Sequence, residues 1–504
     1  MVAKRQFDKD EWDEIRWCHP AAPSSQGLNT STHPGYEDRM RRAPITAMAS
    51  FGQSVVVTAG LDGGVFLAYS ITRRETANGV RGLHLDWGSA SRGGASSSLD
   101  GEYGVGAVSC IAAANGGSTV ESIESKSGNF EENLMKFVDG SRIIAGTTAG
   151  DLRVWSVKDV LSSLFASKVG KETDTSVKSA QTRLKFSLRG RALAGHRGGV
   201  TAIDVPSQVY RPDSIVTGGA DGLIKLWSLR SPTSGRRQNN SEAGGDSASQ
   251  QRGRGGDALS ILTGHTGRIG CVKTAWHGDR LISGGADKTL RVWDLAASGK
   301  CLNVLSGHTG WVNLVKEWGS NTIISGSTDR SLALFDARVS QIPLFTLRYH
   351  DAPITDILVG SRTDPILVSA AADGSIATWD FRSLSQSSED SKTLQSKKGA
   401  NVVREPKVPM GHTSTDEVRP GPVLLCRSIL NPENSFMSLG ADAVVREWDS
   451  NSGRMENELP TGFCDMISGF VPCRSGISHD SDNRLSGFIM SSLDGTVRLR
   501  SLKQ

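Results

Sequence analysis

The chain contains four residues whose types and spacing could supply hydrolytic chemistry: His265, Ser283, Asp287 and Trp293. A serine hydrolase needs a nucleophilic hydroxyl, a histidine that accepts its proton and a carboxylate that orients the histidine. The same residue types recur in three further sets: His196, Thr217, Asp221 and Trp227; His308, Ser325, Asp329 and Phe335; His350, Ser369, Asp373 and Trp379. Because an enzyme needs its triad once per site, a recurring set indicates a structural network in which buried polar groups satisfy one another. No single-copy catalytic cluster stands out, so we predict that the chain is not an enzyme.

These sets recur at a regular spacing because they belong to an internal repeat. His265 and His308 are 43 residues apart, and His308 and His350 are 42 residues apart. Each copy carries short apolar runs separated by Gly, Asp and Ser, a pattern typical of short β-strands joined by tight turns. Four divergent copies extend the array and keep only part of the set: Asp62 in the first, Trp155 in the second, Asp442 and Trp448 in the seventh, and Asp494 in the eighth.

The period and the sequence of each copy, such as GHTGRIG followed by GGADKTLRVWDLA, strongly resemble the WD-repeat family. The resemblance implies an all-β fold, a single eight-bladed WD-repeat β-propeller, with seven blades as the alternative. It also implies roles for the recurring residues: the aspartate accepts a hydrogen bond from the histidine, which reaches the indole N–H through the serine or threonine. Propellers of this family bind other proteins or peptides. We therefore expect a non-catalytic protein-protein interaction scaffold without a cofactor.

The repeats divide the chain into an N-terminal segment, residues 1–42, and a propeller, residues 43–504. Four insertions rich in Ser, Gly, Lys and Glu are expected to be disordered, because they contain few residues that could form a core: 118–132, 159–182, 231–257 and 383–405. The last copy ends just after its third strand, so another segment must close the ring. Residues 13–18 alternate polar and apolar, and we expect Ile15 and Trp17 to face the last blade.

The composition excludes several other classes of protein. The 504 residues include 57 glycines and are 37% hydrophobic and 22% charged, which fits a globular chain with many turns. The net charge of +4 is dispersed, so we predict no specific nucleic-acid partner. Seven scattered cysteines without a CxxC pair indicate reduced thiols rather than disulfides or a metal site. We find no apolar run long enough for a membrane span, and predict a monomeric ring, or part of a larger assembly, in the cytoplasm, with the nucleus as the alternative.

One rim of the propeller is the predicted partner-binding surface. Residues just before the first strand of a blade, and just after its turn aspartate, project onto the same rim; they are Arg197, Arg268, Lys288, Trp311, Arg330 and Asp351. Trp311 is the informative member, because an exposed tryptophan ringed by charges matches the composition of interface hot spots. The alternative interpretation is that Trp311 folds over its own blade as a lid.

Two further resemblances suggest cellular roles. The sixth copy ends in Trp379-Asp380-Phe381-Arg382, and the fifth ends similarly at Arg338. This is similar to the WDxR box by which substrate receptors dock on the adaptor of cullin-RING ubiquitin ligases, so Asp380, Arg382 and Arg338 are candidate docking residues. The alternative is that aspartate and arginine pair locally. The strand spacing also resembles the C-terminal propellers of plant-type DENN or BEACH proteins, which implies a role in membrane trafficking.

Overall fold

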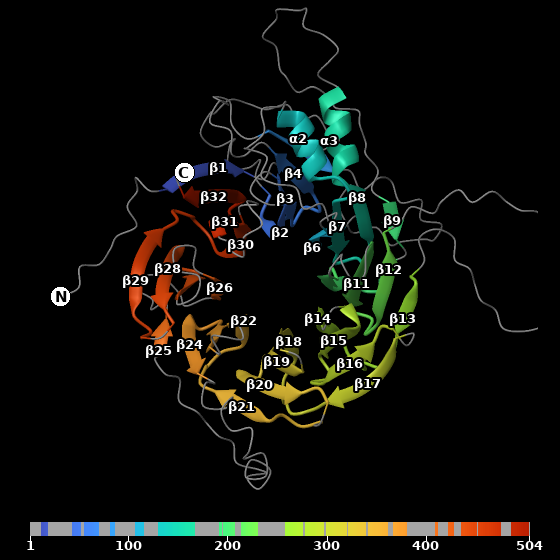
Figure 1. Cartoon of the computed structure of the whole chain (residues 1–504), viewed down its shortest axis with the longest axis vertical. Helices are drawn as coiled ribbons and strands as arrows, with labels where there is room; N and C mark the ends of the chain where they lie inside the picture. Colours follow the sequence, from blue (N-terminus) through green and yellow to red (C-terminus); the bar gives the residue numbers. More distant parts are fainter. Residues whose placement is uncertain are drawn as a thin grey trace, which may run out of the picture.

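The apolar runs of the repeats form β-strands, and the computed structural model arranges its described residues as eight four-stranded antiparallel sheets around a central axis (Figure 1). The chain is an eight-bladed β-propeller, which settles the choice between seven and eight blades. The structure describes residues 12–18, 43–51, 55–69, 81–85, 106–114, 130–166, 191–193, 195–206, 213–229, 258–275, 278–296, 299–319, 321–338, 341–360, 366–380, 409–411, 422–427, 435–450, 452–474 and 485–502.

Each of the first seven blades is formed by four strands that follow one another in the chain. Blades 1 and 2 contain β2 (Ile45–Phe51), β3 (Val55–Gly60), β4 (Val65–Tyr69), β5 (Arg81–Leu85), β6 (Val108–Ala114), β7 (Arg142–Thr147), β8 (Leu152–Ser156) and β9 (Arg191–Leu193). Blades 3 and 4 contain β10 (Val200–Asp204), β11 (Ser214–Gly219), β12 (Ile224–Ser228), β13 (Ser260–Leu262), β14 (Ile269–Ala275), β15 (Arg280–Gly285), β16 (Leu290–Asp294) and β17 (Lys300–Leu305).

The remaining blades repeat this order. Blades 5 and 6 contain β18 (Val312–Trp318), β19 (Thr322–Ser327), β20 (Ser331–Asp336), β21 (Phe345–Arg348), β22 (Ile354–Val359), β23 (Ile366–Ala371), β24 (Ser375–Asp380) and β25 (Pro409–Gly411). Blades 7 and 8 contain β26 (Leu424–Arg427), β27 (Ser435–Leu439), β28 (Val444–Asp449), β29 (Met455–Pro460), β30 (Ile467–Arg474), β31 (Leu485–Ser492), β32 (Thr496–Leu502) and β1 (Trp12–Cys18).

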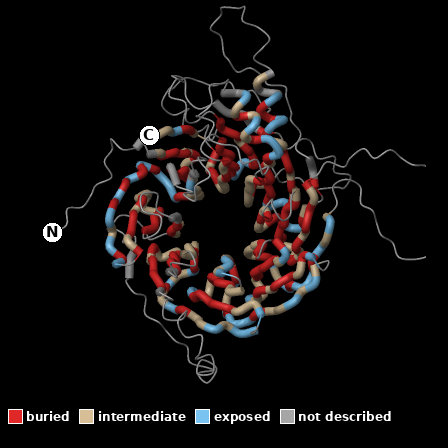
Figure 2. The backbone as a smooth tube through the Cα atoms, in the orientation of Figure 1, coloured by how far each residue is buried: buried red, intermediate tan, exposed pale blue. Residues whose placement is uncertain are grey.

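The core of the ring lies between neighbouring blades. The first strand of each blade runs nearest the centre, and the middle strands are buried on both faces, as the red segments of Figure 2 show. Val312 of blade 5, for example, packs in one cluster with Ile282 and Leu290 of blade 4. Each blade therefore covers the apolar face of the one before it, as radially repeated sheets require.

Blade 8 is completed by the strand from the start of the described chain. β1 pairs antiparallel with β32 along its whole length, from Trp12 opposite Leu502 to Cys18 opposite Thr496. Trp17 is buried, and Ile15 packs against the same cluster, which joins Val497 and Leu499 of blade 8 to Ile45 of blade 1. The last blade thus gains its outermost strand from a segment distant in sequence, and the edge of β32 is covered.

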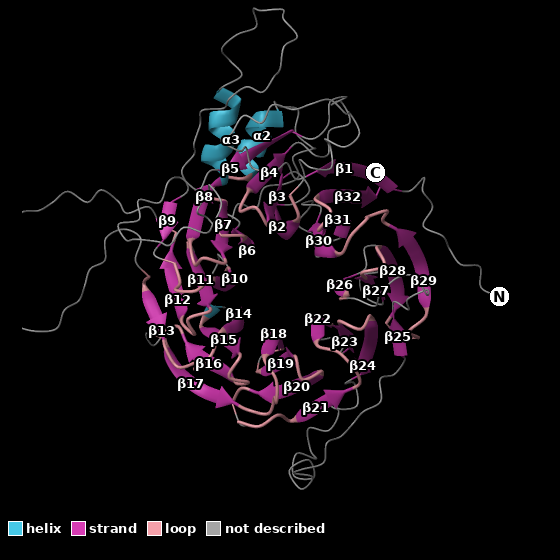
Figure 3. Cartoon of the chain, turned by 180° about the vertical axis from the view of Figure 1, so that it is seen from behind, coloured by secondary structure: helices cyan, strands magenta, loops and turns pink. Residues whose placement is uncertain are grey.

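Two helices lie where the sequence analysis expected disordered insertions (Figure 3). Helix α2 (Phe130–Phe137) includes the last residues of insertion 118–132, and helix α3 (Val157–Ala166) includes the first residues of insertion 159–182. Residues 130–132 and 159–166 are helical, so the prediction of disorder was wrong for these parts. Val160 and Leu161, together with Leu134 just beyond the first insertion, are buried in one cluster with strands of blades 1 and 2. Insertions 231–257 and 383–405 lie outside the described residues.

Candidate interaction surface

The recurring histidine, aspartate, hydroxyl and indole come together in blade 3. His196 precedes β10, and its Nδ1 donates to Oδ1 of Asp221 in the β11–β12 turn at 3.0 Å. Nε2 of His196 lies 2.8 Å from Oγ1 of Thr217, which also accepts the indole N–H of Trp227 at 2.9 Å. The network therefore connects the loop before the blade, the turn and two strands.

Blades 4 and 5 repeat this arrangement with one difference. In blade 4, His265 contacts Asp287 at 2.8 Å and Ser283 at 2.7 Å, and Trp293 donates to Ser283 at 2.9 Å. In blade 5, His308 contacts Asp329 at 3.0 Å and Ser325 at 2.8 Å. The phenyl side chain of Phe335 has no N–H to donate. The hydroxyl of Ser325 instead donates to the backbone carbonyl of Ala333 at 3.3 Å.

Blade 6 departs from the expected chain of contacts. His350 lies 2.8 Å from Ser369, which accepts from Trp379 at 3.0 Å, as in the other blades. Its Nδ1, however, contacts Oγ of Ser375 at 2.5 Å, and this hydroxyl in turn donates to Asp373 at 2.5 Å. The expected direct bond from His350 to Asp373 is therefore replaced by a bond through Ser375, although blade 5 has a serine at the same position, Ser331, and keeps its direct bond from His308 to Asp329.

The blade networks are built to hold loops and not to attack a substrate. Ser283 is fully buried, its oxygen accepts the indole N–H, and no substrate can reach it. Asp287 accepts backbone N–H groups of Thr266 and Thr289, each at 3.1 Å, so it fixes the loop and the turn together. Burial lowers the pKa of His265 more than Asp287 raises it, so the imidazole stays neutral. These features fit the structural interpretation.

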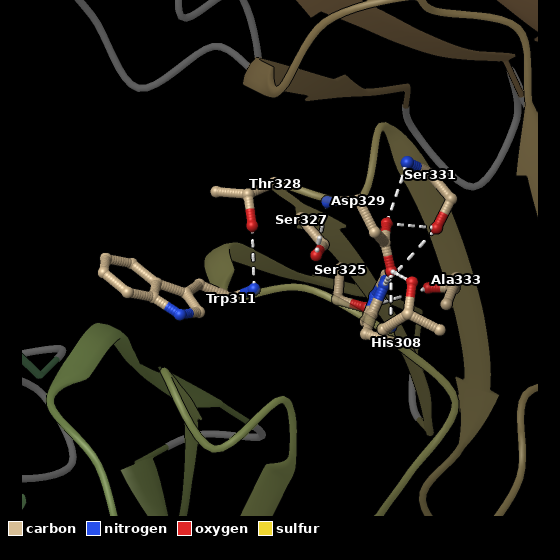
Figure 4. A network of polar contacts seen from close by, with 9 residues as sticks. His308, Trp311, Ser325, Ser327, Thr328, Asp329, Ser331 and Ala333 are labelled. Atoms are coloured by element: carbon tan, nitrogen blue, oxygen red, sulfur yellow. Dashed lines mark hydrogen bonds and ion pairs between the residues drawn. The ribbon is translucent and has the colours of Figure 1, made fainter.

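The six rim residues that the sequence analysis named are all exposed: Arg197, Arg268, Lys288, Trp311, Arg330 and Asp351. Trp311 is 54% exposed, and its indole points away from the His308 network (Figure 4). Its backbone is fixed, because its N–H donates to Oγ1 of Thr328 at 2.8 Å and its carbonyl accepts from the N–H of Thr328 at 2.9 Å. The lid interpretation predicts a buried indole, which this exposure does not match.

Two of the rim residues adopt a backbone conformation that residues other than glycine rarely adopt. Lys288 has φ 67° and Arg330 has φ 71°, which places both in the left-handed region. Each of the two directly follows the turn aspartate of its blade. In five other blades the residue that follows the turn-aspartate position is a glycine, also at positive φ: Gly63, Gly150, Gly222, Gly374 and Gly495. A side chain in this conformation costs about 1 to 2 kcal/mol. Blades 4 and 5 therefore carry a long cation where glycine would be less strained.

The candidate docking residues are placed only in part. Arg338 follows β20 and pairs with Asp336, whose Oδ2 lies 3.1 Å from Nη2 of Arg338. This is the local pairing that the sequence analysis gave as the alternative. Asp380 is the last residue of β24, and Arg382 lies outside the described residues.

A cluster that the sequence analysis missed lies where blade 8 is closed. Arg500 stands where most blades carry the tryptophan, and Glu14 of β1 lies 2.9 Å from it and 3.2 Å from Arg498. Both guanidinium side chains are nearly buried. The signal was present in the sequence, since an arginine at a buried tryptophan position requires a carboxylate partner.

Four segments of the chain match the model of the WD domain, G-beta repeat: residues 188–228, 256–294, 299–336 and 341–380. They contain β9 of blade 2 and the strands of blades 3 to 6 except β25. These four segments match WD repeats, and the ring that contains them is an eight-bladed β-propeller. The chain is also similar, with a TM-score of 0.52 and 18% identity, to the crystal structure of the computationally designed Ika8 protein, covering 91% of this chain and 96% of that one.

Curated relatives of this chain include proteins named for ribosome biogenesis. The chain is 26% identical over 270 residues to the ribosome biogenesis protein YTM1 of Candida glabrata, covering 50% of this chain and 56% of that protein. It is 26% identical over 268 residues to the ribosome biogenesis protein WDR12 homolog of Drosophila mojavensis, covering 52% and 54%. The matches thus span about half the length of these relatives.

The propeller shows no other candidate chemistry in its described parts. No group of three or more His, Cys, Asp or Glu side chains within them could hold a metal ion. No helix among the described residues is both long and apolar enough to cross a membrane. The rim of blades 3 to 6 is therefore the candidate functional site.

Proposed function

We propose that this chain is a non-catalytic protein-protein interaction scaffold whose rim, formed by the six residues defined above, receives a protein or peptide partner. The observation that carries the proposal is Trp311, a large indole that is 54% exposed on a backbone held by Thr328. Fixed exposed tryptophans next to arginines are typical of residues that dominate binding energy. The blade networks keep the loops of this rim in place.

A photo-crosslinking amino acid at position 311 tests this function. In cells that express the chain naturally, we expect it to give a discrete crosslinked protein. In an affinity pull-down without the crosslinker, we expect the unmodified chain to capture that protein and Trp311→Ala to lose it. The same crosslinker in place of Lys158, an exposed residue of α3, is the matched control. Equal crosslinking at both positions, or none at position 311, would contradict a partner on the rim.

The names of the relatives suggest the first assembly to search for such a partner. Two of them are called ribosome biogenesis proteins, with 26% identity over about half of this chain. We propose a particle of ribosome assembly as the first place to look, which favours the nucleus over the cytoplasm as the location. Co-sedimentation of the chain with ribosomal precursors is the measurement, and its absence from those fractions counts against this assembly.

Two other cellular roles rest on resemblance alone. The strand spacing favours a scaffold in membrane trafficking, which co-fractionation with vesicles would test. The WDxR ending favours a substrate receptor of a cullin-RING ubiquitin ligase as the alternative. Because Arg338 is paired with Asp336, this alternative depends on Arg382, and Arg382→Ala should then abolish co-purification with the ligase adaptor.

A further inference from the structure

The charge of the rim is unevenly distributed around the ring. Its four cations belong to three consecutive blades and form what we call the basic arc: Arg197, Arg268, Lys288 and Arg330. Beyond the arc the rim carries Asp351 before blade 6 and Asp465 before blade 8, both exposed. Within the described part of the chain, none of the four arc side chains has an ion-pair partner. The arc is therefore available to an anionic group from outside.

Backbone contacts place the arc residues next to one another and next to Trp311. The carbonyl of Arg268 accepts from Ala286 at 2.8 Å, which brings this loop against the turn that carries Lys288. In the next blade, Trp311 is bonded to Thr328, two residues before Arg330. The inner strands of the two blades, β14 and β18, are neighbours in the ring (Figure 1). Trp311 therefore lies in the same blade as Arg330, and in the blade next to the one that carries Lys288.

The backbone conformation singles out Lys288 and Arg330 among the cations. Both occupy left-handed positions where five blades carry glycine. Glycine would satisfy the turn with less strain, so the blade fold does not require a cation there. Strained backbone that the fold does not require is concentrated at binding sites. One of the two strained cations belongs to the blade of the exposed indole and the other to the neighbouring blade, and the exposed indole is an independent feature of an interface.

We propose that the basic arc and Trp311 bind an acidic peptide segment that carries an apolar side chain, with Lys288 and Arg330 contacting its carboxylates and Trp311 its apolar residue. The proposal rests on the proposed scaffold function and names the chemistry of the partner. Asp351 limits the arc on the side of blade 6 and sets the end of the segment by repulsion. A nucleic acid is disfavoured, because its affinity comes from many phosphate contacts and this rim offers four cations followed by a carboxylate.

Fluorescence anisotropy with a fluorescein-labelled peptide that alternates Glu and Leu tests the proposal on the full chain. The variants are Lys288→Gly and Arg330→Gly, alone and together. We expect the double variant to lose about tenfold or more in affinity without a lower melting temperature, since glycine suits both turns. The matched control is Ala443→Gly, which changes the same left-handed turn position in blade 7 without removing a charge. It should leave affinity unchanged.

Four outcomes would overturn the proposal. The first is equal affinity for a peptide in which Gln replaces Glu, and the second is equal affinity of the double variant and the unmodified chain. The third is that a fluorescein-labelled oligouridylate binds more tightly than the Glu peptide, which would assign the arc to nucleic acid. The fourth is that the Glu peptide, added in excess before irradiation, does not prevent crosslinking at position 311; this inference then fails while the scaffold function stands. If no protein is crosslinked at all, the scaffold function itself fails.

Discussion

Glu14 of β1 and Arg500 of β32 form an ion pair, with Oε2 of Glu14 2.9 Å from Nη2 of Arg500. The two residues face each other in the antiparallel register that completes blade 8. Glu14 also contacts Arg498 at 3.2 Å, and each arginine side chain is 9% exposed. One carboxylate therefore balances two nearly buried guanidinium groups, and it belongs to the strand that closes the ring.

We predict that Glu14→Gln lowers the free energy of unfolding by about 2 to 4 kcal/mol, because removing one partner of a buried ion pair leaves the other charge uncompensated. Urea unfolding of the whole chain measures the loss. Arg16→Gln is the matched control on the same strand. Arg16 also bonds Glu14, but its side chain is 61% exposed, so its loss should cost less than about 1 kcal/mol. Equal losses would show that burial at this junction does not matter.

The same pair makes ring closure sensitive to acid. Burial raises the pKa of Glu14, but the hydrogen bond from Arg16 and the charges of Arg500 and Arg498 outweigh it and hold the pKa below its ordinary value. The carboxylate therefore stabilises the folded state above the pKa of the unfolded chain, and this contribution is lost as pH falls through the lower folded pKa. The stability gap between the chain and Glu14→Gln should close under acidic conditions. A gap that widens in acid would contradict the pairing.

Truncation of the two tryptophans of neighbouring blades should lower the free energy of unfolding by very different amounts. Trp293 is 1% exposed and donates its N–H to Ser283, so Trp293→Ala should cost about 3 to 5 kcal/mol. Trp311 is 54% exposed, and its hydrogen bonds come from its backbone, so Trp311→Ala should cost less than about 1 kcal/mol. Thermal unfolding of both variants measures this. A large loss at Trp311 would restore the lid interpretation.

Removing the turn aspartate should cost more stability in a blade with a complete network than in a blade with an incomplete one. Asp287 accepts from His265 as well as from two backbone N–H groups, so Asp287→Ala strands a buried histidine at a cost of about 1 to 3 kcal/mol. Asp494 bonds Cys464 and Thr496 and no histidine. Asp494→Ala should therefore cost less. Equal losses in urea unfolding would mean that the histidine contributes nothing.

The eight blades and their order could be predicted from the sequence, because the blades repeat, completely or in part, a set of residues that hydrogen-bond one another. The aspartate, the hydroxyl and the indole recur at set positions, since each satisfies a buried partner. Phe335 and Ser375 show the limit of this reasoning. A repeat pattern gives the position of a side chain but not its hydrogen-bond partner: Ser331 and Ser375 occupy the same position, yet His308 contacts Asp329 directly. His350 instead reaches Asp373 through Ser375.

The helices α2 and α3 were missed because the insertions were judged by composition. The spacing of Val157, Val160 and Leu161 is helical and could have indicated α3. These residues are buried in one cluster with blade 2, which is adjacent in sequence, and with blade 1, which is distant in sequence. The pairing of Glu14 with Arg500 was missed for a similar reason. It depends on which segment closes the ring, and a local sequence pattern does not show which residues face each other across that junction.

Blade 6 should make the chain less stable at mildly acidic pH. Burial lowers the pKa of His350 to about 4, and the charges of Asp373 and Asp351 only partly oppose this. Between that value and the ordinary histidine value of about 6.5, the unfolded chain binds a proton that the folded chain does not. Stability therefore falls as pH falls through this range. His196 and His265 have pKa values lowered by burial and act in the same direction.

The variant His350→Gln isolates the contribution of this one residue. It should be less stable than the unmodified chain at about pH 7, because Ser369 and Ser375 lose a partner. The difference in unfolding free energy should shrink by about 2 kcal/mol between about pH 7 and pH 5, since glutamine does not titrate. Urea unfolding at both pH values measures the difference. A difference that stays constant would show that His350 takes up its proton equally in both states, and that its burial in the blade 6 network does not control its charge.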